Sequence, residues 1–451
     1  MSYSRPIFIL AMAVSMMVSA LNPSLAAEPV KAKKSTPRSE FFSYETREDA
    51  SAGAIINSQY FKSIRNRTDE NGVCATTYFT PYAMGDRNVF FRCDGGAGAY
   101  EIFVNDRLAG GSSDTQTPSE VYISPYLVDG LNQVRIEARE PGKALAVESM
   151  YEEPMLVMGG NSFFISQPKV YIEDFDICTT PDSTGNHGLL DLHIVVRNSS
   201  RADQKLSLGW DIYDPKGKLK TYDLRELEMA PGERDTVRFH NIIYSTAKYL
   251  WSAENPNLYA LTMYIKQYGS ITEYVPFTVG WGTTRYADGV ITRNDTPIEI
   301  KAVEFTPKYN LPMSEQIKAL KRKGYNTIYL TMPAQIGLYA ACNSEGMYVV
   351  DCPTLYTDAK GGDRSRGNGT SFNDPTLLDE VLHRTLAMQR RTRNYACVIA
   401  WSLARGGGNG YNLYKSYELL HSLDTLRPAV YREAEGEWNS DIELPAPATL
   451  K

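Results

Sequence analysis

The sequence predicts a multidomain β plus α/β fold, in which two β-sandwiches precede a domain of parallel βα units. The chain has 451 residues, which corresponds to about three domains of about 150 residues each. Up to about residue 285, short stretches of alternating apolar and polar residues are separated by turn residues. After that point strand patterns alternate with helical patterns, which is typical of parallel βα units.

The composition narrows the class of protein. Hydrophobic residues make up 43% of the chain, charged residues 22%, and the net charge is −6. These values exclude a disordered or low-complexity chain, and without a basic excess we expect no nucleic-acid partner. No apolar run after the N-terminus is long enough to cross a bilayer, so we expect no transmembrane segment. The 30 tyrosines fit β-strands and equally a sugar- or protein-binding surface.

Residues 1–27 have the layout of a secretory signal peptide. Arg5 precedes an apolar run at 7–14, and the small residues around Ala26 and Ala27 form a cleavage site. The alternative, an N-terminal anchor helix, is disfavoured because Pro23 interrupts the run. We therefore expect an exported protein, in the periplasm or associated with the outer membrane or cell surface. Residues 28–43, with three lysines and two prolines, predict a linker.

The two sandwiches follow from alternation and turn signals. Residues 44–168 contain five strand-like stretches with turns at 105–106 and 129–130, and residues 169–284 form a second sandwich of immunoglobulin-like length. The strands expected in the first are 89–93, 100–104, 107–109, 121–123 and 132–138, and those in the second include 190–196, 206–213 and 261–265.

Residues 285–451 read as βα units with about six strands. A helix that we expect Ser314 to cap ends at Gly324, and further helices are expected at 335–344, from Asp374 onward and at 412–423. The expected strands are 298–303, 326–330, 347–350, 397–401, 429–431 and 441–444.

The six cysteines fit no metal-binding pattern, and no metal site or cofactor is expected. Export would permit disulfide bonds between Cys74 and Cys93 and between Cys342 and Cys352. Buried free thiols are the alternative.

Three passages match one known family in the same order along nearly 400 residues. The first extends from 94 to 105 and continues at 118–120, 123–127 and 130–132; the second is WSAENPNLY at 251–259; the third is VIAWSL at 398–403 with 424–428 and 440–442. Together they resemble glycoside hydrolase family 2, the β-galactosidase and β-glucuronidase family. The resemblance implies a jelly-roll sandwich, an immunoglobulin-like sandwich and a (β/α)8 TIM-type barrel, here incomplete.

The resemblance also implies that the catalytic residues are missing. The family's acid/base glutamate ends the pattern Trp-Ser-Leu-Gly-Asn-Glu, which here reads Trp401 to Gly406, with Arg405 at the asparagine position and Gly406 at the glutamate position. An arginine cannot replace the acid/base because its pKa is too high to cycle a proton. The family nucleophile ends the seventh strand, which has no counterpart before Lys451. We therefore assign no catalytic residue.

Several residues at the expected strand ends remain candidates for contacting a ligand. Trp401 is the favoured stacking aromatic, although burial in the core is the common alternative for tryptophan. The glycine-rich stretch 405–410 lacks the Lys-Ser/Thr of a phosphate-binding loop. The candidates are Glu304, Tyr329, Asp351, Trp401, Arg405, Asn409 and Trp438.

Two functions remain open. The first is an exported, non-catalytic family 2-like protein that binds a glycan or acts as a scaffold subunit in an envelope complex. About 167 residues remain for a barrel that usually takes about 250, so we expect open sheet edges that a protein partner or a second copy covers. The alternative is a glycosidase of β-galactoside or β-glucuronide type, completed by another chain or using Glu304 or Glu433.

Overall fold

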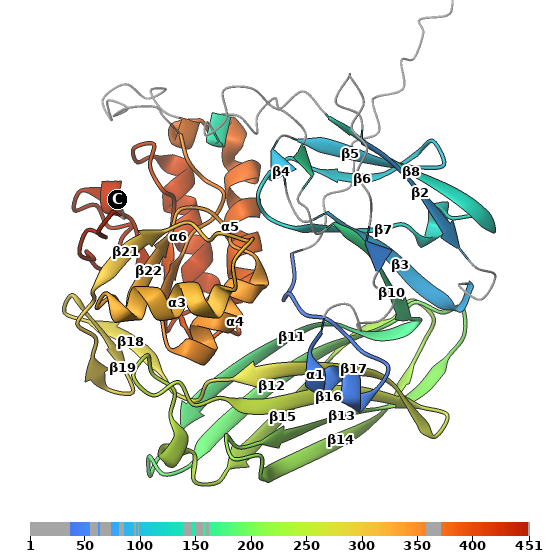
Figure 1. Cartoon of the computed structure of the whole chain (residues 1–451), viewed down its shortest axis with the longest axis horizontal. Helices are drawn as coiled ribbons and strands as arrows, with labels where there is room; N and C mark the ends of the chain where they lie inside the picture. Colours follow the sequence, from blue (N-terminus) through green and yellow to red (C-terminus); the bar gives the residue numbers. More distant parts are fainter. Residues whose placement is uncertain are drawn as a thin grey trace, which may run out of the picture.

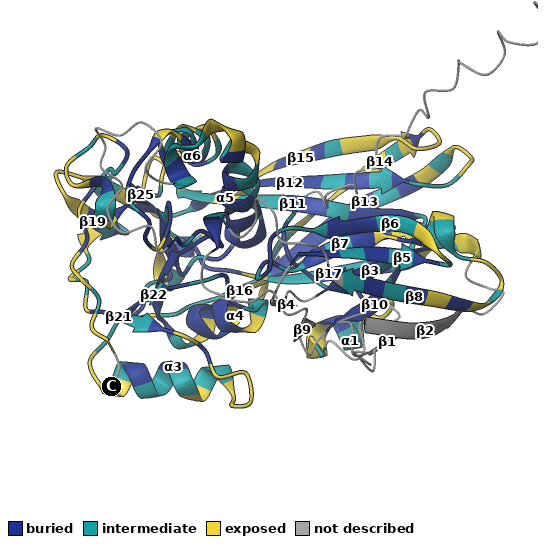
Figure 2. Ribbon diagram, turned by 90° about the horizontal axis from the view of Figure 1, so that it is seen from above, coloured by how far each residue is buried: buried dark blue, intermediate teal, exposed yellow. Residues whose placement is uncertain are grey.

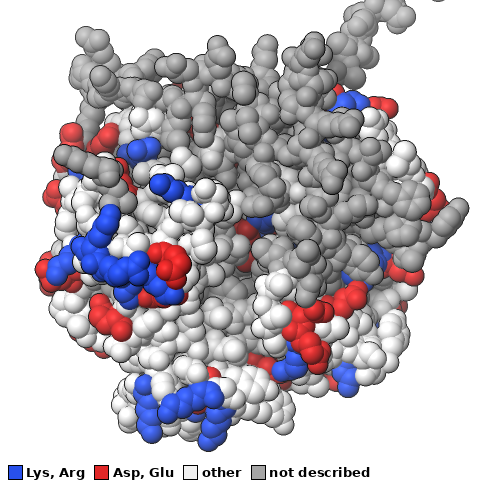
Figure 3. Space-filling model, viewed as in Figure 1, with Lys and Arg blue, Asp and Glu red and all other residues white. Residues whose placement is uncertain are grey.

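The computed structural model describes residues 37–54, 62–63, 74–80, 85–93, 96–97, 99–138, 146–148, 157–158, 162–357 and 371–449. The expected signal peptide and residues 28–36 lie outside them. The described residues form the three expected domains, two all-β and one α/β (Figure 1). No helix among them is both long and apolar enough to span a bilayer. Figure 3 shows acidic and basic side chains close together on the described part of one face.

The first domain is a sandwich of two four-stranded sheets. In the hairpin between β5 and β6, Asn105 and Asp106 have φ of 50° and 60°, the conformation of tight hairpin turns that asparagine and aspartate tolerate. One sheet contains, in spatial order, β1 (Lys62–Ser63), β10 (Phe163–Pro168), β3 (Arg87–Cys93) and β7 (Ser119–Tyr122); the other contains β2 (Cys74–Thr80), β8 (Gly130–Ala138), β5 (Tyr100–Val104) and β6 (Arg107–Ser112). A separate pair joins β4 (Gly96–Ala97) to β9 (Val157–Met158).

The second domain is the immunoglobulin-like sandwich, with three strands facing four. Its strands alternate between buried and partly exposed residues (Figure 2), most regularly in β12, because one face of each sheet packs on the other. The sheets are β11 (Val170–Pro181), β12 (Gly188–Asn198) and β15 (Arg234–Ile243), and β14 (Leu219–Met229), β13 (Gln204–Tyr213), β16 (Tyr259–Gln267) and β17 (Ser270–Val279). Helix α1 (Arg47–Ala52) lies against β17.

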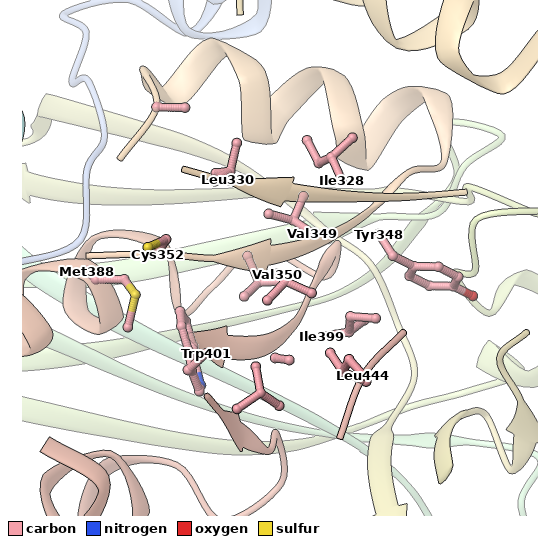
Figure 4. Close-up of a cluster of buried hydrophobic side chains, with 14 of the residues drawn as sticks. Ile328, Leu330, Tyr348, Val349, Val350, Cys352, Met388, Ile399, Trp401 and Leu444 are labelled. Atoms are coloured by element: carbon pink, nitrogen blue, oxygen red, sulfur yellow. The ribbon is translucent and has the colours of Figure 1, made fainter. Parts of the chain in front are cut away.

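A small antiparallel sheet that the sequence did not predict leads into the third domain, which holds a five-stranded parallel sheet. Figure 4 shows Ile328, Val349 and Ile399 from three adjacent strands in its core. The small sheet is β18 (Thr284–Ala287), β19 (Val290–Arg293) and β20 (Thr296–Pro297); the parallel strands are β21 (Ala302–Phe305), β22 (Thr327–Leu330), β23 (Tyr348–Asp351), β24 (Val398–Ser402) and β25 (Ala429–Val430); the helices are α3 (Met313–Arg322), α4 (Ile336–Glu345), α5 (Leu378–Thr392) and α6 (Tyr411–Leu423). The incomplete TIM-type barrel is thus confirmed.

The expected sixth strand at 441–444 is wrong, because the C-terminal segment runs as irregular backbone. The Asp441 N–H donates to the Ala429 carbonyl at 2.9 Å, which places the start of this segment beside β25. Farther on, Ala448 pairs in parallel with β21: its N–H donates to the Ala302 carbonyl and its carbonyl accepts from the Glu304 N–H, both at 2.9 Å. The edge of β21, expected to be open, is therefore covered at this point by the chain itself.

Local expectations also differ. Pro312, not Ser314, is the N-cap of α3, and Ser314 instead donates to the Glu345 carboxylate at 2.5 Å. Neither expected disulfide forms, because Cys93, Cys342 and Cys352 are buried free thiols. The side chain of Cys74 lies outside the described residues.

Residues 37–43, expected to end a linker, are packed between the domains (Figure 1). Glu40 is 6% exposed and accepts hydrogen bonds from Arg92 of the first sandwich and Arg391 of α5. Burial disfavours its charge, but the two guanidinium groups outweigh that cost and hold the pKa of Glu40 below its ordinary value. This segment therefore ties the first domain to the third.

Candidate functional site

A cavity of about 360 Å³ lies at the carboxyl ends of the parallel strands. Parallel strands end on the same edge of their sheet, so the residues at their ends converge there, as in other barrels of this type. The C-terminal segment forms one wall, with Ile442 and Leu444. The residues lining the rest of the cavity include Glu304, Tyr329, Thr331, Cys352, Ser402, Arg405, Tyr431, Arg432 and Glu433.

Three of the seven candidate residues come together in this cavity: Glu304, Tyr329 and Arg405. The Arg405 guanidinium lies 5.3 Å from the centre of the Tyr356 ring, a cation–π contact that orients it. The Tyr329 hydroxyl is 3.4 Å from the Pro445 carbonyl of the C-terminal wall, and burial raises the pKa of this tyrosine, so its hydroxyl stays protonated and can donate.

Position 406 is a glycine, and Glu433 lies directly beside it. A Cβ atom placed on Gly406 would stand 3.3 Å from Oε1 of Glu433, while Oε2 accepts the Gly408 N–H at 2.5 Å. Gly407 and Gly408 have φ of 109° and 73°, a conformation that favours glycine. The glycine-rich loop therefore binds the carboxylate of this chain's own Glu433.

Trp401 and Asp351, two further candidates for contacting a ligand, are buried and do not line the cavity. Trp401 has no exposed surface, and its Nε1 donates to Asp424 at 2.9 Å while Arg427 lies over its ring. Asp351 accepts from the hydroxyls of Tyr339 and Thr392 at 2.8 and 2.6 Å. Both side chains point into the layer between the sheet and the helices, where apolar packing or hydrogen bonds hold them.

The remaining two candidates lie outside the cavity in different ways. Asn409 is buried and exchanges two hydrogen bonds with Asn439, at 2.9 and 2.8 Å. Trp438 is 56% exposed and stacks on Tyr414. Asn409 therefore holds two loops together, and Trp438 is accessible at the surface.

Tyr431, Ser402 and Thr331 also line the cavity but were not among the predicted site residues. Their positions at the ends of β22, β24 and β25 were the available signal, but many polar residues end strands. Tyr431 donates to the Gly408 carbonyl at 2.5 Å, so it too supports the glycine-rich loop. Carboxylates, hydroxyls and guanidinium groups in one cavity suit a ligand with many hydroxyl groups. The described residues contain no group of three metal-ligating side chains.

Two family models match the chain. "Glycosyl hydrolases family 2" matches residues 170–281, and "Glycosyl hydrolases family 2, TIM barrel domain" matches residues 289–445. The chain belongs to glycoside hydrolase family 2. The two matches cover the immunoglobulin-like sandwich and the incomplete barrel.

Curated relatives of this family 2 chain are longer. The β-galactosidase of Priestia megaterium is 27% identical over 368 residues, which cover 78% of this chain and 35% of the relative. The β-galactosidase of Streptococcus thermophilus is 27% identical over 386 residues, covering 80% and 36%. The chain thus spans about a third of the length of these relatives.

Solved structures share the fold. A putative β-galactosidase from Bacteroides fragilis has a TM-score of 0.66 at 16% identity, covering 80% of this chain and 55% of that one. A Bacteroides uniformis β-glucuronidase has a TM-score of 0.66 at 14% identity, covering 89% and 52%. At this identity the likeness concerns the fold alone.

Proposed function

We propose that this chain binds a sugar in the cavity without hydrolysing it, as an exported binding or scaffold protein. The observation that carries the proposal is the state of position 406. The family pattern puts a proton-donating glutamate there, whereas this chain has glycine with the Glu433 carboxylate beside it. A retaining glycosidase needs an acid/base and a nucleophile about 5–5.5 Å apart, and the residue at the acid/base position of the pattern, Gly406, has no carboxylate.

The cavity keeps groups that recognise sugar hydroxyls. Arg405 offers several N–H donors, while Glu304 and Glu433 offer acceptors. Charge-assisted hydrogen bonds of this kind contribute about 1.5–3 kcal/mol each. The apolar wall of Ile442 and Leu444 would cover the C–H surface of a sugar ring.

We expect Arg405→Ala to weaken sugar binding at least tenfold without changing the fold. The relevant measurement is titration calorimetry with methyl β-D-galactoside and methyl β-D-glucuronide, beside an assay with the corresponding chromogenic glycosides. The matched control is Arg285→Ala, an exposed arginine on β18 paired with Asp295. Binding without turnover supports the proposal, whereas turnover clearly above background, or no binding of either sugar, contradicts it.

A second candidate is residual hydrolysis, which one observation favours: Glu304 and Glu433 line the same cavity. Turnover that Glu304→Gln or Glu433→Gln abolishes would establish it. Turnover unaffected by either variant would instead point to a contaminating enzyme.

Export is part of the proposal and rests on the layout of residues 1–27. Mass spectrometry of the protein recovered from its native cell envelope should show a new N-terminus next to Ala26 or Ala27. An intact N-terminus on the mature protein would contradict export. The scaffold role requires a partner, which light scattering and native pull-down can detect as a complex heavier than the monomer.

A further inference from the structure

An exposed aromatic surface lies on α6 and the loop after β25. Trp438 is 56% exposed and Tyr411 is 41% exposed. The Trp438 ring stacks on Tyr414, with centroids 4.9 Å apart and planes 27° apart, and meets Tyr417 edge-on at 5.5 Å. We call Tyr411, Tyr414 and Trp438 the aromatic shelf.

The shelf is rigid. Tyr417, which supports Trp438 from the side, donates its hydroxyl to Asp441 at 2.7 Å. The next residue after Trp438, Asn439, is fully buried and holds Asn409 by two hydrogen bonds. The indole of Trp438 is held against Tyr414 and Tyr417 and is 56% exposed, so a ligand could stack there with little loss of side-chain entropy.

The shelf and the cavity share the loop after β25. The loop after β25 carries Glu433, which lines the cavity, and Trp438 five residues later. Their Cα atoms can be no more than about 18 Å apart, since an extended residue spans at most about 3.6 Å. The Asn409–Asn439 pair joins this loop to the glycine-rich loop that begins at Arg405. Both loops that line the cavity therefore also support the shelf.

The charges around the shelf favour an uncharged occupant. Lys415 lies over the Tyr411 ring but is paired with Glu418 at 2.7 Å. His421 is paired with Asp441 at 3.0 Å. With these two side chains paired locally, the shelf offers flat apolar faces beside them. The C–H face of a neutral pyranose ring, whose hydroxyls point outward to water, complements such a surface.

We propose that the aromatic shelf binds further units of a glycan whose end occupies the cavity, so the ligand is an oligosaccharide rather than a single sugar. This inference rests on the proposed sugar binding in the cavity. The chain contains five tryptophans, all within the described residues, and the other four have no exposed surface. Iodide quenching of tryptophan fluorescence therefore reports on Trp438.

The experiment compares methyl β-D-galactoside with a β-1,4-linked galactotetraose. We expect the tetrasaccharide to bind more tightly and to protect Trp438 from iodide, whereas the monosaccharide gives little protection. Trp438→Ala should weaken tetrasaccharide binding at least tenfold and leave monosaccharide binding unchanged, and Trp438→Phe should restore part of the loss. Tyr268→Ala, on a hairpin of the second sandwich where the side chain is 88% exposed, is the matched control.

The outcomes separate the two proposals. If both sugars bind equally well and Trp438 stays open to iodide, the shelf proposal fails while binding in the cavity stands. If neither sugar binds to the wild type or to Arg405→Ala, the proposed function fails, and the shelf proposal fails with it. Protection of Trp438 that rises with protein concentration and needs no sugar would assign the shelf to self-association instead.

Discussion

Glu273 is a buried carboxylate whose environment contains no salt bridge among the described residues. It has no exposed surface, and it accepts hydrogen bonds from the Ile172 N–H at 2.7 Å and from Gln167 at 3.1 Å. Burial raises the pKa of Glu273 to about 7, although these hydrogen bonds oppose the shift. In the unfolded chain a glutamate titrates near its ordinary value of about 4.3.

This difference predicts a pH dependence of stability. Because the folded pKa is the higher one, the contribution of Glu273 is complete below the unfolded pKa and is lost as the pH rises through about 7. We expect the free energy of unfolding to fall by a few kcal/mol at most from this group, since one pKa unit corresponds to about 1.4 kcal/mol. Urea unfolding of the wild type and of Glu273→Gln between about pH 3.3 and about pH 8, roughly one unit beyond each end of the titration, measures it.

Glu273→Gln should flatten that pH profile, because glutamine keeps the shape and cannot ionise. The control is Glu299→Gln, an exposed carboxylate paired with Lys301, which should leave the profile as it is. Identical profiles for wild type and Glu273→Gln would contradict the assignment.

At the scale of the element, the C-terminal segment lies along the parallel sheet as irregular backbone, where the sequence predicts a sixth strand at 441–444. Both the N–H and the carbonyl of Ala448 form hydrogen bonds with β21. Leu444 lies in the barrel core beside Ile399 (Figure 4). The five-stranded sheet therefore gains a cover over the edge of β21 and a wall for the cavity. Segment 441–448 thus links stability of the sheet to the shape of the candidate site.

We expect Ala448→Pro to open this cover. Proline has no N–H to donate to the Ala302 carbonyl, so the substitution should cost about 1–3 kcal/mol and expose the Glu304 amide to hydrogen exchange. The measurement is hydrogen exchange of residues 302–305 with thermal unfolding. Ala446→Pro, at an exposed residue between two prolines, is the control, and equal protection of Glu304 in both variants would refute the cover.

At the scale of the whole molecule, segment 37–43 and helix α5 hold the three domains together. Arg391 of α5 binds Glu40, which also binds Arg92 of the first sandwich. Two residues farther on, Arg393 donates to Asp174 of the second sandwich at 3.1 Å. Buried charges therefore join one helix end to the second sandwich directly and to the first sandwich through Glu40.

Loss of the Glu40 charge should loosen this arrangement. Glu40→Gln removes the carboxylate that pairs with both Arg391 and Arg92, although Arg92 keeps Glu120 at 3.3 Å. Removing one partner of a buried pair costs about 3–5 kcal/mol. We expect a lower midpoint in urea and a separate early transition as the domains come apart, followed by circular dichroism and tryptophan fluorescence. Glu45→Gln, whose side chain is 55% exposed beside Arg87, should unfold as the wild type does.

Local patterns in the sequence predicted the fold class, most of the strands and the family. The strands at 190–196 and 206–213 could be predicted because apolar and polar residues alternate along a strand that faces one core. The turn at 105–106 could be predicted because asparagine and aspartate tolerate positive φ. The motif from Trp401 to Gly406 carried the family and placed Arg405 at the strand end, where the cavity was found. Glu304 and Tyr329 were predicted in the same way, because they lie near the carboxyl ends of parallel strands.

Only the tertiary structure decided which residues face the cavity and what covers the sheet. Trp401 and Asp351 also end strands, but their side chains point to the helix layer, because successive residues of a strand face opposite sides. The pairing of Ala448 with β21 joins residues about 145 positions apart, beyond the reach of any local pattern. Two further contacts likewise depend on loops that packing brings together: Glu433 beside Gly406, and Trp438 stacked on Tyr414.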